Sequence, residues 1–355
     1  TVAVYSDADA RAAFVREADR AVLIGPAAAS DSYLRGDRII AVALETGAQA
    51  IHPGYGFLSE NAGFARAVAE AGLTFVGPTP EQIELMGDKV RARAFVAGGG
   101  FPVAPSAIED DDPATFAERA LKVPFPLLIK PAAGGGGKGM RIVREPAQLK
   151  AELERARSEG QRYFGDGRLY VERYIENPRH IEVQVLGDAH GNVVHLFERE
   201  CSVQRRFQKI VEETPSPALD PELRSRICET AAGIARKAGY RNAGTVEFIF
   251  GAGGEFYFLE MNTRLQVEHP VTELVYGVDL VDWQLRIAQG EKLPLGQDEV
   301  LDNRLGHAIE VRLCAEDPRQ NYLPQTGKVL RWQAPAGEGV RVDTYLESGK
   351  SISPY

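Results

Sequence analysis

The sequence predicts an α/β fold at the start of the chain and an α+β fold after it. Over residues 2–76, short apolar strands alternate with helical patterns, which is typical of βαβ units and a parallel sheet. From residue 180 onward, the predicted strands are longer, and apolar and polar residues alternate along them. Between these parts, over 127–143, two apolar strands flank a glycine-rich loop. We therefore expect at least two units with different kinds of sheet.

The predicted N-terminal unit has a polar loop after its third strand. Its strands are expected over 2–5, 22–24, 50–52 and 74–76, and its helices over 39–44 and 62–71. Ligands of parallel sheets lie beyond the carboxyl ends of the strands, where loop 52–60 would be. This loop is therefore a candidate site wall, and Ser59 is placed to cap the helix after it. A helix over 80–97 is expected to link this unit to the next.

The glycine-rich loop over 134–139 is a candidate phosphate-binding element. It contains five glycines and Lys138, and a strand rather than a helix follows it, so it is not a Walker A motif. Glycine amides without side chains can fold over phosphates. We expect a mobile lid here, with Lys130 supplying positive charge where the phosphates would lie. The alternative is a merely flexible turn.

A predicted β-hairpin with its turn at 251–254 carries two carboxylates on one face. Glu247 and Glu260 face the same side, and Asn262 projects there too if the strand continues. Hard oxygen ligands suit Mg²⁺ or Mn²⁺ carried in with nucleotide phosphates. The alternative is that one glutamate simply pairs with a nearby arginine.

The segment 260–269 turns abruptly polar after the apolar strand 256–259. Charged side chains are almost never fully buried unless they are paired or bind metal, so this change indicates a ligand site. A solvated loop after a buried strand is the alternative. The basic, amide-rich segment 201–209 is a weaker indication of an anion site.

Composition restricts the classes of partner. The chain has 355 residues, 44% hydrophobic and 26% charged, with a formal net charge of -9. An acidic balance argues against a general nucleic-acid or anionic-membrane surface, and no apolar run approaches the roughly 20 residues of a membrane span. Three scattered cysteines fit reduced thiols, so we expect a cytoplasmic protein.

Five segments occur in the order typical of one family: 52–61, 86–89, 134–140, 260–273 and 306–312. With them the chain resembles, over essentially its whole length, the biotin carboxylase component of biotin-dependent acyl-CoA, acetyl-CoA or pyruvate carboxylases. The resemblance implies an ATP-grasp fold preceded by a Rossmann-like parallel-sheet domain. The implied domains are 1–79, 80–295 with a mobile lid at about 103–175, and an incomplete C-terminal biotin carboxylase domain at 302–355.

The resemblance also implies a reaction. Enzymes of this family use ATP to activate bicarbonate as carboxyphosphate and transfer the CO₂ to biotin on a carrier protein. The implied requirements are ATP, two Mg²⁺ or Mn²⁺ ions, bicarbonate and carrier-bound biotin. The implied partners are a biotin carboxyl carrier protein or domain, a carboxyltransferase subunit and a second copy of the chain in a homodimer.

Roles follow for residues that match the family's motifs. ATP binding is implied for Lys89, Lys130, Gly135, Gly136, Gly137, Gly139, Glu172, Tyr174, Ile175, His180 and Gln204. Metal binding is implied for Glu247, Glu260 and Asn262, and bicarbonate binding for Arg264, Gln266, Val267 and Lys209. Catalysis is implied for Glu268, Arg264, Lys209 and Arg312, with Glu268 as the base that deprotonates bicarbonate and Arg312 as the group that stabilises enolate-like biotin.

The chain departs from the family's pattern in three places. Phe207 stands where many relatives carry a polar residue, often His, so we expect weaker ATP binding than in a Phe207→His variant. The start lacks the family's opening strand, and the end stops where its final unit should continue, so we expect a chain truncated at both ends. Two alternatives stay open: another ATP-grasp carboxylate ligase, and a non-catalytic nucleotide-binding fragment.

Overall fold

The N-terminal part combines short parallel strands with helices, as the sequence predicts. The computed structural model describes residues 1–109, 112–131, 140–206 and 208–354. In the N-terminal part, β1 (Val2–Ser6) pairs in parallel with β2 (Arg20–Gly25), and β3 (Ala50–Ile51) with β4 (Thr74–Phe75). The helices beside them are α1 (Ala13–Glu17), α2 (Gly36–Thr46) and α3 (Ala62–Glu70). Ala43, Phe64, Val68 and Leu73 form a buried cluster between these elements.

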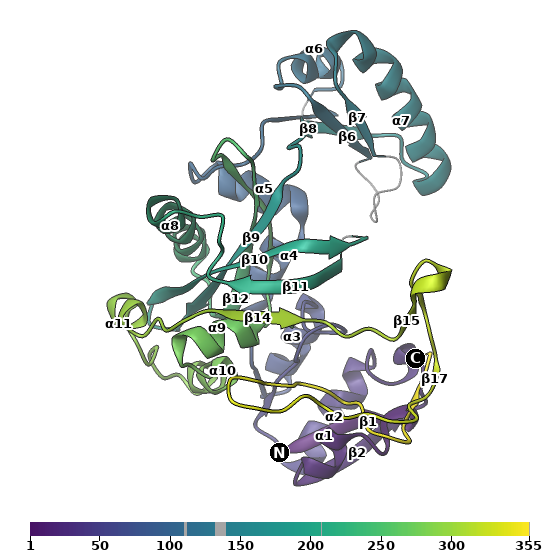
Figure 1. The fold of residues 1–355 in the computed structure, drawn as a ribbon, viewed down its shortest axis with the longest axis vertical. Coiled ribbons are helices and arrows are strands. Elements are labelled where there is room, and N and C mark those ends of the chain that lie inside the picture. The colour runs from purple at the N-terminus through teal and green to yellow at the C-terminus, as the bar shows by residue number, and fades with distance from the viewer. Residues whose placement is uncertain (110–111, 132–139, 207, 355) are drawn as a thin grey trace.

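A separate antiparallel sheet lies at the top of the molecule in Figure 1. Within the described residues its strand order is β5 (Ser106–Ile108), β8 (Leu169–Arg173), β6 (Leu127–Pro131) and β7 (Arg141–Val143). Helices α6 (Phe116–Leu121) and α7 (Leu149–Phe164) pack on it. Leu127 and Ile129 alternate with less buried residues along β6 and share a buried cluster with Val171, as period-two strands require. The predicted glycine loop over 134–139 lies outside the described residues.

A larger antiparallel sheet forms the centre of the molecule (Figure 1). Its strand order, for the part of the chain that is described, is β13 (Phe256–Asn262), β12 (Asn242–Phe250), β9 (Arg179–Gly187), β10 (Val193–Arg205), β11 (Gln208–Thr214) and β14 (Ala308–Val311). The helices that add buried side chains to its core are α4 (Pro80–Gly87), α5 (Lys89–Ala97), α8 (Pro221–Lys237), α9 (His269–Tyr276), α10 (Leu280–Ala288) and α11 (Gln297–Asp302).

Strand β9 shows how this sheet positions polar groups. Ile181, Val183 and Val185 alternate with Glu182 and Gln184, and all five are fully buried. The apolar set belongs to the core cluster. Successive side chains of a strand point to opposite faces, so the second face of β9 is buried but polar. A buried polar face requires partners, which neighbouring strands supply.

The predicted helix over 80–97 is wrong in one respect, because two helices, α4 and α5, meet at Asp88. The backbone of Asp88 is extended (φ -89°, ψ 111°), so the first helix cannot continue through it. Its side chain accepts hydrogen bonds from the amides of Val90 and Arg91. These amides have no helical partners, and the carboxylate satisfies them as a cap.

The predicted cap of the next helix after loop 52–60 is also wrong. Asn61, not Ser59, precedes α3, and its side chain accepts a hydrogen bond from the amide of Phe64. Ser59 is buried instead. Both Ser and Asn are good capping residues, so the local pattern alone does not decide between two positions that are two residues apart.

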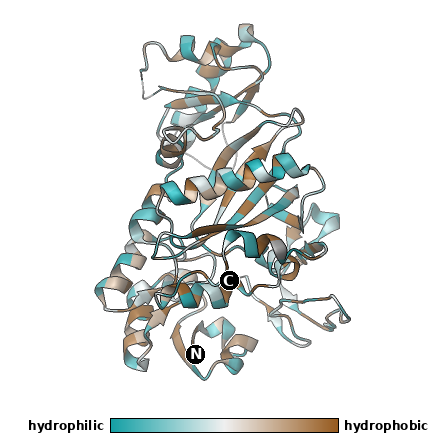
Figure 2. Ribbon diagram, turned by 90° about the vertical axis from the view of Figure 1, so that its left-hand side faces the viewer, coloured by the Kyte–Doolittle hydropathy of each residue, from teal (hydrophilic) through white to brown (hydrophobic). Residues whose placement is uncertain are grey.

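The last part of the chain lies beside the N-terminal part. β15 (Glu316–Asp317) pairs with β16 (Leu323–Pro324), and β17 (Gly327–Lys328) pairs with β18 (Ser351–Ile352). Figure 1 shows this segment next to β1, and an ion pair joins Arg16 to Glu347. Figure 2 shows hydrophilic and hydrophobic residues along the same helices, as expected where one face is buried. In the described ranges, no helix has both the length and the apolar character that crossing a membrane requires.

Candidate active site

The hairpin of β12 and β13 brings predicted metal ligands close together. Glu247 and Glu260 are directly opposed across the two strands, so the predicted shared face is confirmed. The register itself differs from that of a turn centred on 252–253, because it shifts between Glu247 and Phe248, and Phe248 pairs with Phe258. Asn262 Nδ2 donates to Glu247 Oε1 at 2.6 Å. Glu260 Oε2 instead lies 2.9 Å from the ammonium of Lys89, at the start of α5. The structure therefore joins Asn262 to Glu247, and gives Glu260 a different partner.

Lys209, on β11, is the centre of a buried cluster of carboxylates. Its ammonium donates to a carboxylate oxygen of Glu182, to Glu247 Oε1 at 2.8 Å and to Glu268 Oε1 at 2.7 Å. It also donates to Gln266 Oε1 at 3.1 Å. Burial disfavours the charged form, but the surrounding carboxylates outweigh it and raise the pKa of Lys209 above its ordinary value. Lys209 is therefore a fixed positive charge.

Glu268 lies between two cations. It is almost fully buried, directly before α9. Its Oε1 accepts from Lys209, and its Oε2 accepts from Arg312 Nη2 at 2.8 Å. Arg312 follows β14, and its backbone amide donates to Ile210 O on β11 at 3.0 Å. Arg312 is far from Lys209 and Glu268 in the sequence. The pairing of β11 with β14 brings it to the same carboxylate as Lys209.

Two residues that support this cluster were not predicted from the sequence. Glu182 on β9 and Arg199 on β10 are opposed in register and both fully buried. Arg199 Nε donates to Glu182 Oε1 at 2.6 Å. Burial would raise the pKa of Glu182, but Lys209 and Arg199 together lower it. The polar residues at alternate positions of β9, from His180 to Gln184, are the signal that could have revealed this face.

Arg264 is held by the loop that the sequence predicted as a site wall. Glu60 Oε2 accepts from Arg264 Nε at 2.9 Å, and Glu60 Oε1 accepts from the Thr263 amide at 2.9 Å. Arg264 Nη2 also donates to Asn262 Oδ1 at 3.2 Å. Because Asn262 contacts Glu247, Arg264 connects to the Lys209 cluster. Gln266 donates to Glu247 Oε1 at 3.1 Å, and Val267 lies between Gln266 and Glu268 in the same loop.

Lys130 and Glu172 form a second cluster on the smaller sheet. They project from β6 and β8 and make an ion pair, with Arg93 Nη1 at 3.9 Å from Glu172. Burial disfavours the ammonium, but Glu172 and Tyr170 raise the pKa of Lys130 above its ordinary value. The residue predicted to hold phosphate and the residue predicted to meet adenine are therefore neighbours.

The other predicted nucleotide residues lie on both sheets. His180 Nε2 is 2.9 Å from Glu247 Oε2, and Gln204 Nε2 donates to Cys201 O at 2.8 Å. The Tyr174 amide donates to Pro126 O at 2.8 Å, next to buried Ile175. The remaining predicted positions, namely Gly135, Gly136, Gly137 and Gly139, and the departure at Phe207, lie outside the described residues.

The donor set fits a divalent cation carried with nucleotide phosphates. Glu247, Glu260 and Asn262 offer carboxylate and amide oxygens, which are the ligands that Mg²⁺ prefers. His180, Glu182 and Glu247 also hold ligand atoms within 4.8 Å of one another. The ammonium of Lys209 lies between the carboxylates of Glu182, Glu247 and Glu268. These carboxylates therefore already surround a positive charge. Two carboxylates and the amide oxygen of Asn262 suit Mg²⁺ or Mn²⁺.

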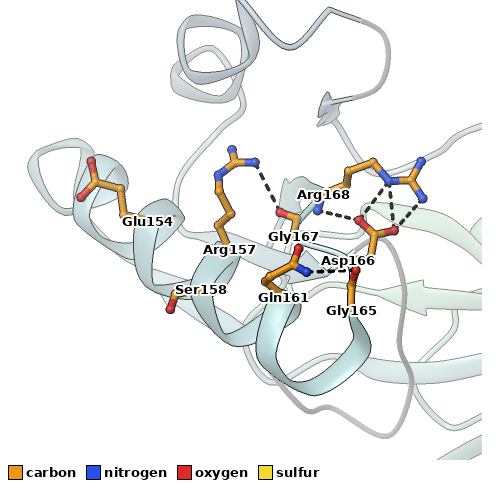
Figure 3. A pocket seen from close by; sticks show the side chains of 8 residues that line it. All are labelled: Glu154, Arg157, Ser158, Gln161, Gly165, Asp166, Gly167 and Arg168. Atoms are coloured by element: carbon orange, nitrogen blue, oxygen red, sulfur yellow. Dashed lines mark hydrogen bonds and ion pairs between the residues drawn. The ribbon is translucent and has the colours of Figure 1, made fainter.

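A groove on the smaller sheet is unrelated to these clusters. Figure 3 shows its lining, which comes from the last turns of α7 and the segment before β8. Its arginines already have partners there: Arg157 pairs with Glu109 at 2.5 Å, and Arg168 pairs with Asp166 at 2.6 Å. No sequence-predicted site residue lines this groove. We therefore place the candidate site at the Lys209 cluster.

Family descriptions match three consecutive parts of the chain. "Biotin carboxylase, N-terminal domain" matches residues 1–83. "Carbamoyl-phosphate synthase L chain, ATP binding domain" matches residues 88–296, which include Lys209, Glu247 and Glu268. "Biotin carboxylase C-terminal domain" matches residues 310–355, which include Arg312. Glu268 and its partner Arg312 therefore come from two different matched parts.

Solved structures of similar sequence share the fold. The biotin carboxylase domain of 2-oxoglutarate carboxylase from Hydrogenobacter thermophilus, a dimer in complex with MgADP, ADP and bicarbonate, is 47% identical, with a TM-score of 0.88 over 100% of this chain and 78% of that one. Biotin carboxylase from Campylobacter jejuni is 44% identical, with a TM-score of 0.89 over 99% of this chain and 78% of that one. The prediction of an ATP-grasp fold with a parallel-sheet domain before it is confirmed.

Curated relatives cover the whole chain. The alpha subunit of methylcrotonoyl-CoA carboxylase from Oryza sativa, a mitochondrial protein, is 52% identical over 99% of this chain and 48% of its own length, so this chain spans about half of that relative. Biotin carboxylase from Halalkalibacterium halodurans is 49% identical over 100% of this chain and 78% of its own length. With this identity over the whole of its length, the chain belongs to the biotin carboxylase family.

Proposed function

We propose that the chain catalyses the ATP-dependent carboxylation of biotin on a carrier protein, with bicarbonate as the source of carbon. The observation that carries the proposal is the position of Glu268, held by Lys209 on one side and Arg312 on the other. A base for bicarbonate must lie beside an anion site, and Arg264 and Gln266 of the same loop contact Asn262 and Glu247 of this cluster. Solved relatives with bicarbonate and MgADP support the choice of substrates.

In the proposed first step, Arg264, Gln266 and the Val267 amide hold bicarbonate while Glu268 removes its proton. The freed oxygen attacks the γ-phosphorus of ATP, and the bond to the β,γ-bridging oxygen breaks, which yields ADP and carboxyphosphate. Lys209 is placed to offset negative charge on bicarbonate and on the phosphate that is later released. Its fixed charge and close contact with Glu268 support this role.

In the second step, carboxyphosphate releases CO₂ and phosphate, the phosphate takes the proton from N1′ of biotin, and N1′ takes up the CO₂. Arg312 would stabilise the enolate-like form of biotin, because its guanidinium is the cation that the end of β14 brings to Glu268. Lys89 and Lys130 would hold ATP phosphates, and Glu172, Tyr174, Ile175, His180 and Gln204 would line the nucleotide site. When bound by Glu247, Glu260 and Asn262, Mg²⁺ would neutralise charge on the transferred phosphoryl group.

The proposal extends to partners and organisation. A carrier protein with biotin, a carboxyltransferase subunit and a homodimer are proposed, supported by relatives described as carboxylase alpha subunits and as a biotin carboxylase dimer. We also propose three domains and a mobile lid. The domains are 1–79, 80–295 and 302–355, and the lid lies at about 103–175. Cytoplasmic location stays a prediction, and the mitochondrial location of the rice relative is the alternative.

A second candidate function is a carbamoyl-phosphate type of ligase, because that description matches residues 88–296. Such an enzyme would require ammonia rather than biotin as the acceptor. The contact between Glu268 and Arg312 favours the first proposal, because Arg312 lies in the segment that matches biotin carboxylases.

The test is ADP formation that depends on both bicarbonate and biotin. We expect turnover with wild-type protein and a loss of about 100-fold or more in Glu268→Gln, as for removal of a general base. Arg264→Met should raise the KM for bicarbonate. ADP formation driven by ammonia and not by biotin would select the second candidate, and biotin-dependent turnover that survives in Glu268→Gln would refute the assigned base.

A further inference from the structure

Glu212 is a buried carboxylate behind the site that the proposed reaction does not use. It lies on β11, two residues before the strand ends, and is fully buried. Its Oε1 accepts from Arg312 Nε at 2.6 Å. Its Oε2 has no hydrogen-bond partner among the described residues. A buried carboxylate with one unpartnered oxygen costs free energy, so it requires an explanation other than stability.

The position of Glu212 relative to Arg312 supplies that explanation. The guanidinium is held from two sides, by Glu212 at Nε and by Glu268 at Nη2, 2.8 Å away. Two contacts at different nitrogens fix the plane of a guanidinium, whereas one contact leaves it free to rotate. Without Glu212, the Arg312 guanidinium would be free to donate from two nitrogens to Glu268. It would then turn away from the biotin side of the site.

The strand pairing makes this arrangement rigid. β11 and β14 are antiparallel, and Glu212 is directly opposed to Glu310, two residues before Arg312. Glu310 also has a buried oxygen, Oε2, without a partner in the described part of the chain. Two carboxylates opposed across a pair of strands repel each other when both are charged. Two opposed carboxylates are a poor choice for packing. Their presence here therefore favours a role in holding Arg312.

We infer that Glu212 is a positioning residue that orients the Arg312 guanidinium towards Glu268 and the biotin side of the site. The effect on catalysis rests on the proposed function. The contact between Glu212 and Arg312 does not. In this role Glu212 touches no substrate and acts only through Arg312.

The first test measures Arg312 itself and requires no activity. The full chain is treated with phenylglyoxal, which modifies arginine side chains, and the rates at Arg312 and Arg264 are followed by mass spectrometry of the peptides. Loss of a charge-assisted hydrogen bond should raise the rate at Arg312 about tenfold in Glu212→Ala and Glu212→Gln. Arg264, held by Glu60, should not change. An unchanged rate at Arg312 in both variants would overturn the inference.

The matched control is Glu213→Ala. Glu213 is the next residue of β11, points to the other face and lies 3.0 Å from His307. It should leave the Arg312 rate unchanged. Glu212→Gln keeps the side-chain volume and replaces only the charged acceptor with a weaker neutral one, so it guards against a variant that simply fails to fold. Equal acceleration in Glu213→Ala would indicate general loosening of β11 and would contradict the inference.

The second test is a double-mutant cycle on biotin-dependent ADP formation. Glu212→Gln should lower kcat about tenfold in the wild-type background, with little change in the KM for ATP. In an Arg312→Met background it should cause no further loss, because the residue acts through Arg312. An equal loss in both backgrounds would refute the inference. If wild-type protein shows no biotin-dependent turnover while Arg312 still reacts faster in Glu212→Gln, the proposed function fails and the positioning role stands.

Discussion

Replacing Arg199 with methionine should destabilise the central sheet strongly. The guanidinium is fully buried, and its contacts are Glu182 Oε1 at 2.6 Å, Gln184 Oε1 at 2.9 Å, Thr272 Oγ1 at 3.0 Å and Thr245 Oγ1 at 3.2 Å. Methionine fills much of the space but leaves the buried Glu182 carboxylate with Lys209 as its remaining cation. Removal of one partner from a buried ion pair costs about 3–5 kcal/mol, because the other charge stays buried. We expect a loss in this range.

Urea unfolding followed by tryptophan fluorescence measures this loss, since Trp283 lies in the core of the same sheet. The matched control is Arg286→Met, whose ion pair with Asp282 on the surface of α10 is about half exposed. That pair should contribute only about 0.3–0.5 kcal/mol. A loss below about 1 kcal/mol in Arg199→Met, or an equal loss in both variants, would refute the claim that the stability of the central sheet depends on Arg199 as a counterion of buried Glu182.

Two further predictions concern the edges of the site. Burial, with Glu212 and Glu268 nearby, raises the pKa of Glu310 from 4.5 to about 7, so its stabilising contribution is complete below pH 4.5 and lost as pH rises through 7. The full difference corresponds to about 3 kcal/mol, which solvent screening reduces to about 1 kcal/mol. Glu310→Gln should therefore remove this pH dependence of unfolding between pH 5 and 8, and an unchanged dependence would contradict it. Glu60→Gln should raise the KM for bicarbonate several-fold with kcat nearly unchanged, because Arg264 loses a charged partner; a fall in kcat alone would count against this role.

The sequence predicts those parts of the site that a short-range pattern controls. The shared face of Glu247 and Glu260 was predicted from the short hairpin, although an irregularity between Glu247 and Phe248 sets their direct opposition. The break at Asp88 was missed, because apolar periodicity continues through 80–97 while a single capping carboxylate ends one helix and starts another. Here a side-chain hydrogen bond decides the local structure, and periodicity does not report it.

The supporting charges depend on long-range register, which the sequence does not reveal. Arg199 meets Glu182 because β10 has an irregularity between His195 and Glu198, which changes the residues that face β9. Without it, a period-two count would pair different residues. Glu60, in the loop before α3, meets Arg264, in the loop after β13, from 204 positions away. Local propensities carry no information on such a contact. Glu268 and the loop 264–267 were therefore predicted as site residues, whereas the contacts of Glu182 with Arg199 and of Glu60 with Arg264 were not.

The most direct test of the central claim is the formation of acid-labile labelled carboxybiotin from ATP, Mg²⁺, biotin and ¹⁴C-bicarbonate. Labelled product is expected with wild-type protein, and none above background when ATP is omitted or in Glu268→Gln. ATP hydrolysis by wild-type protein without labelled carboxybiotin, or equal product from Glu268→Gln, would contradict it.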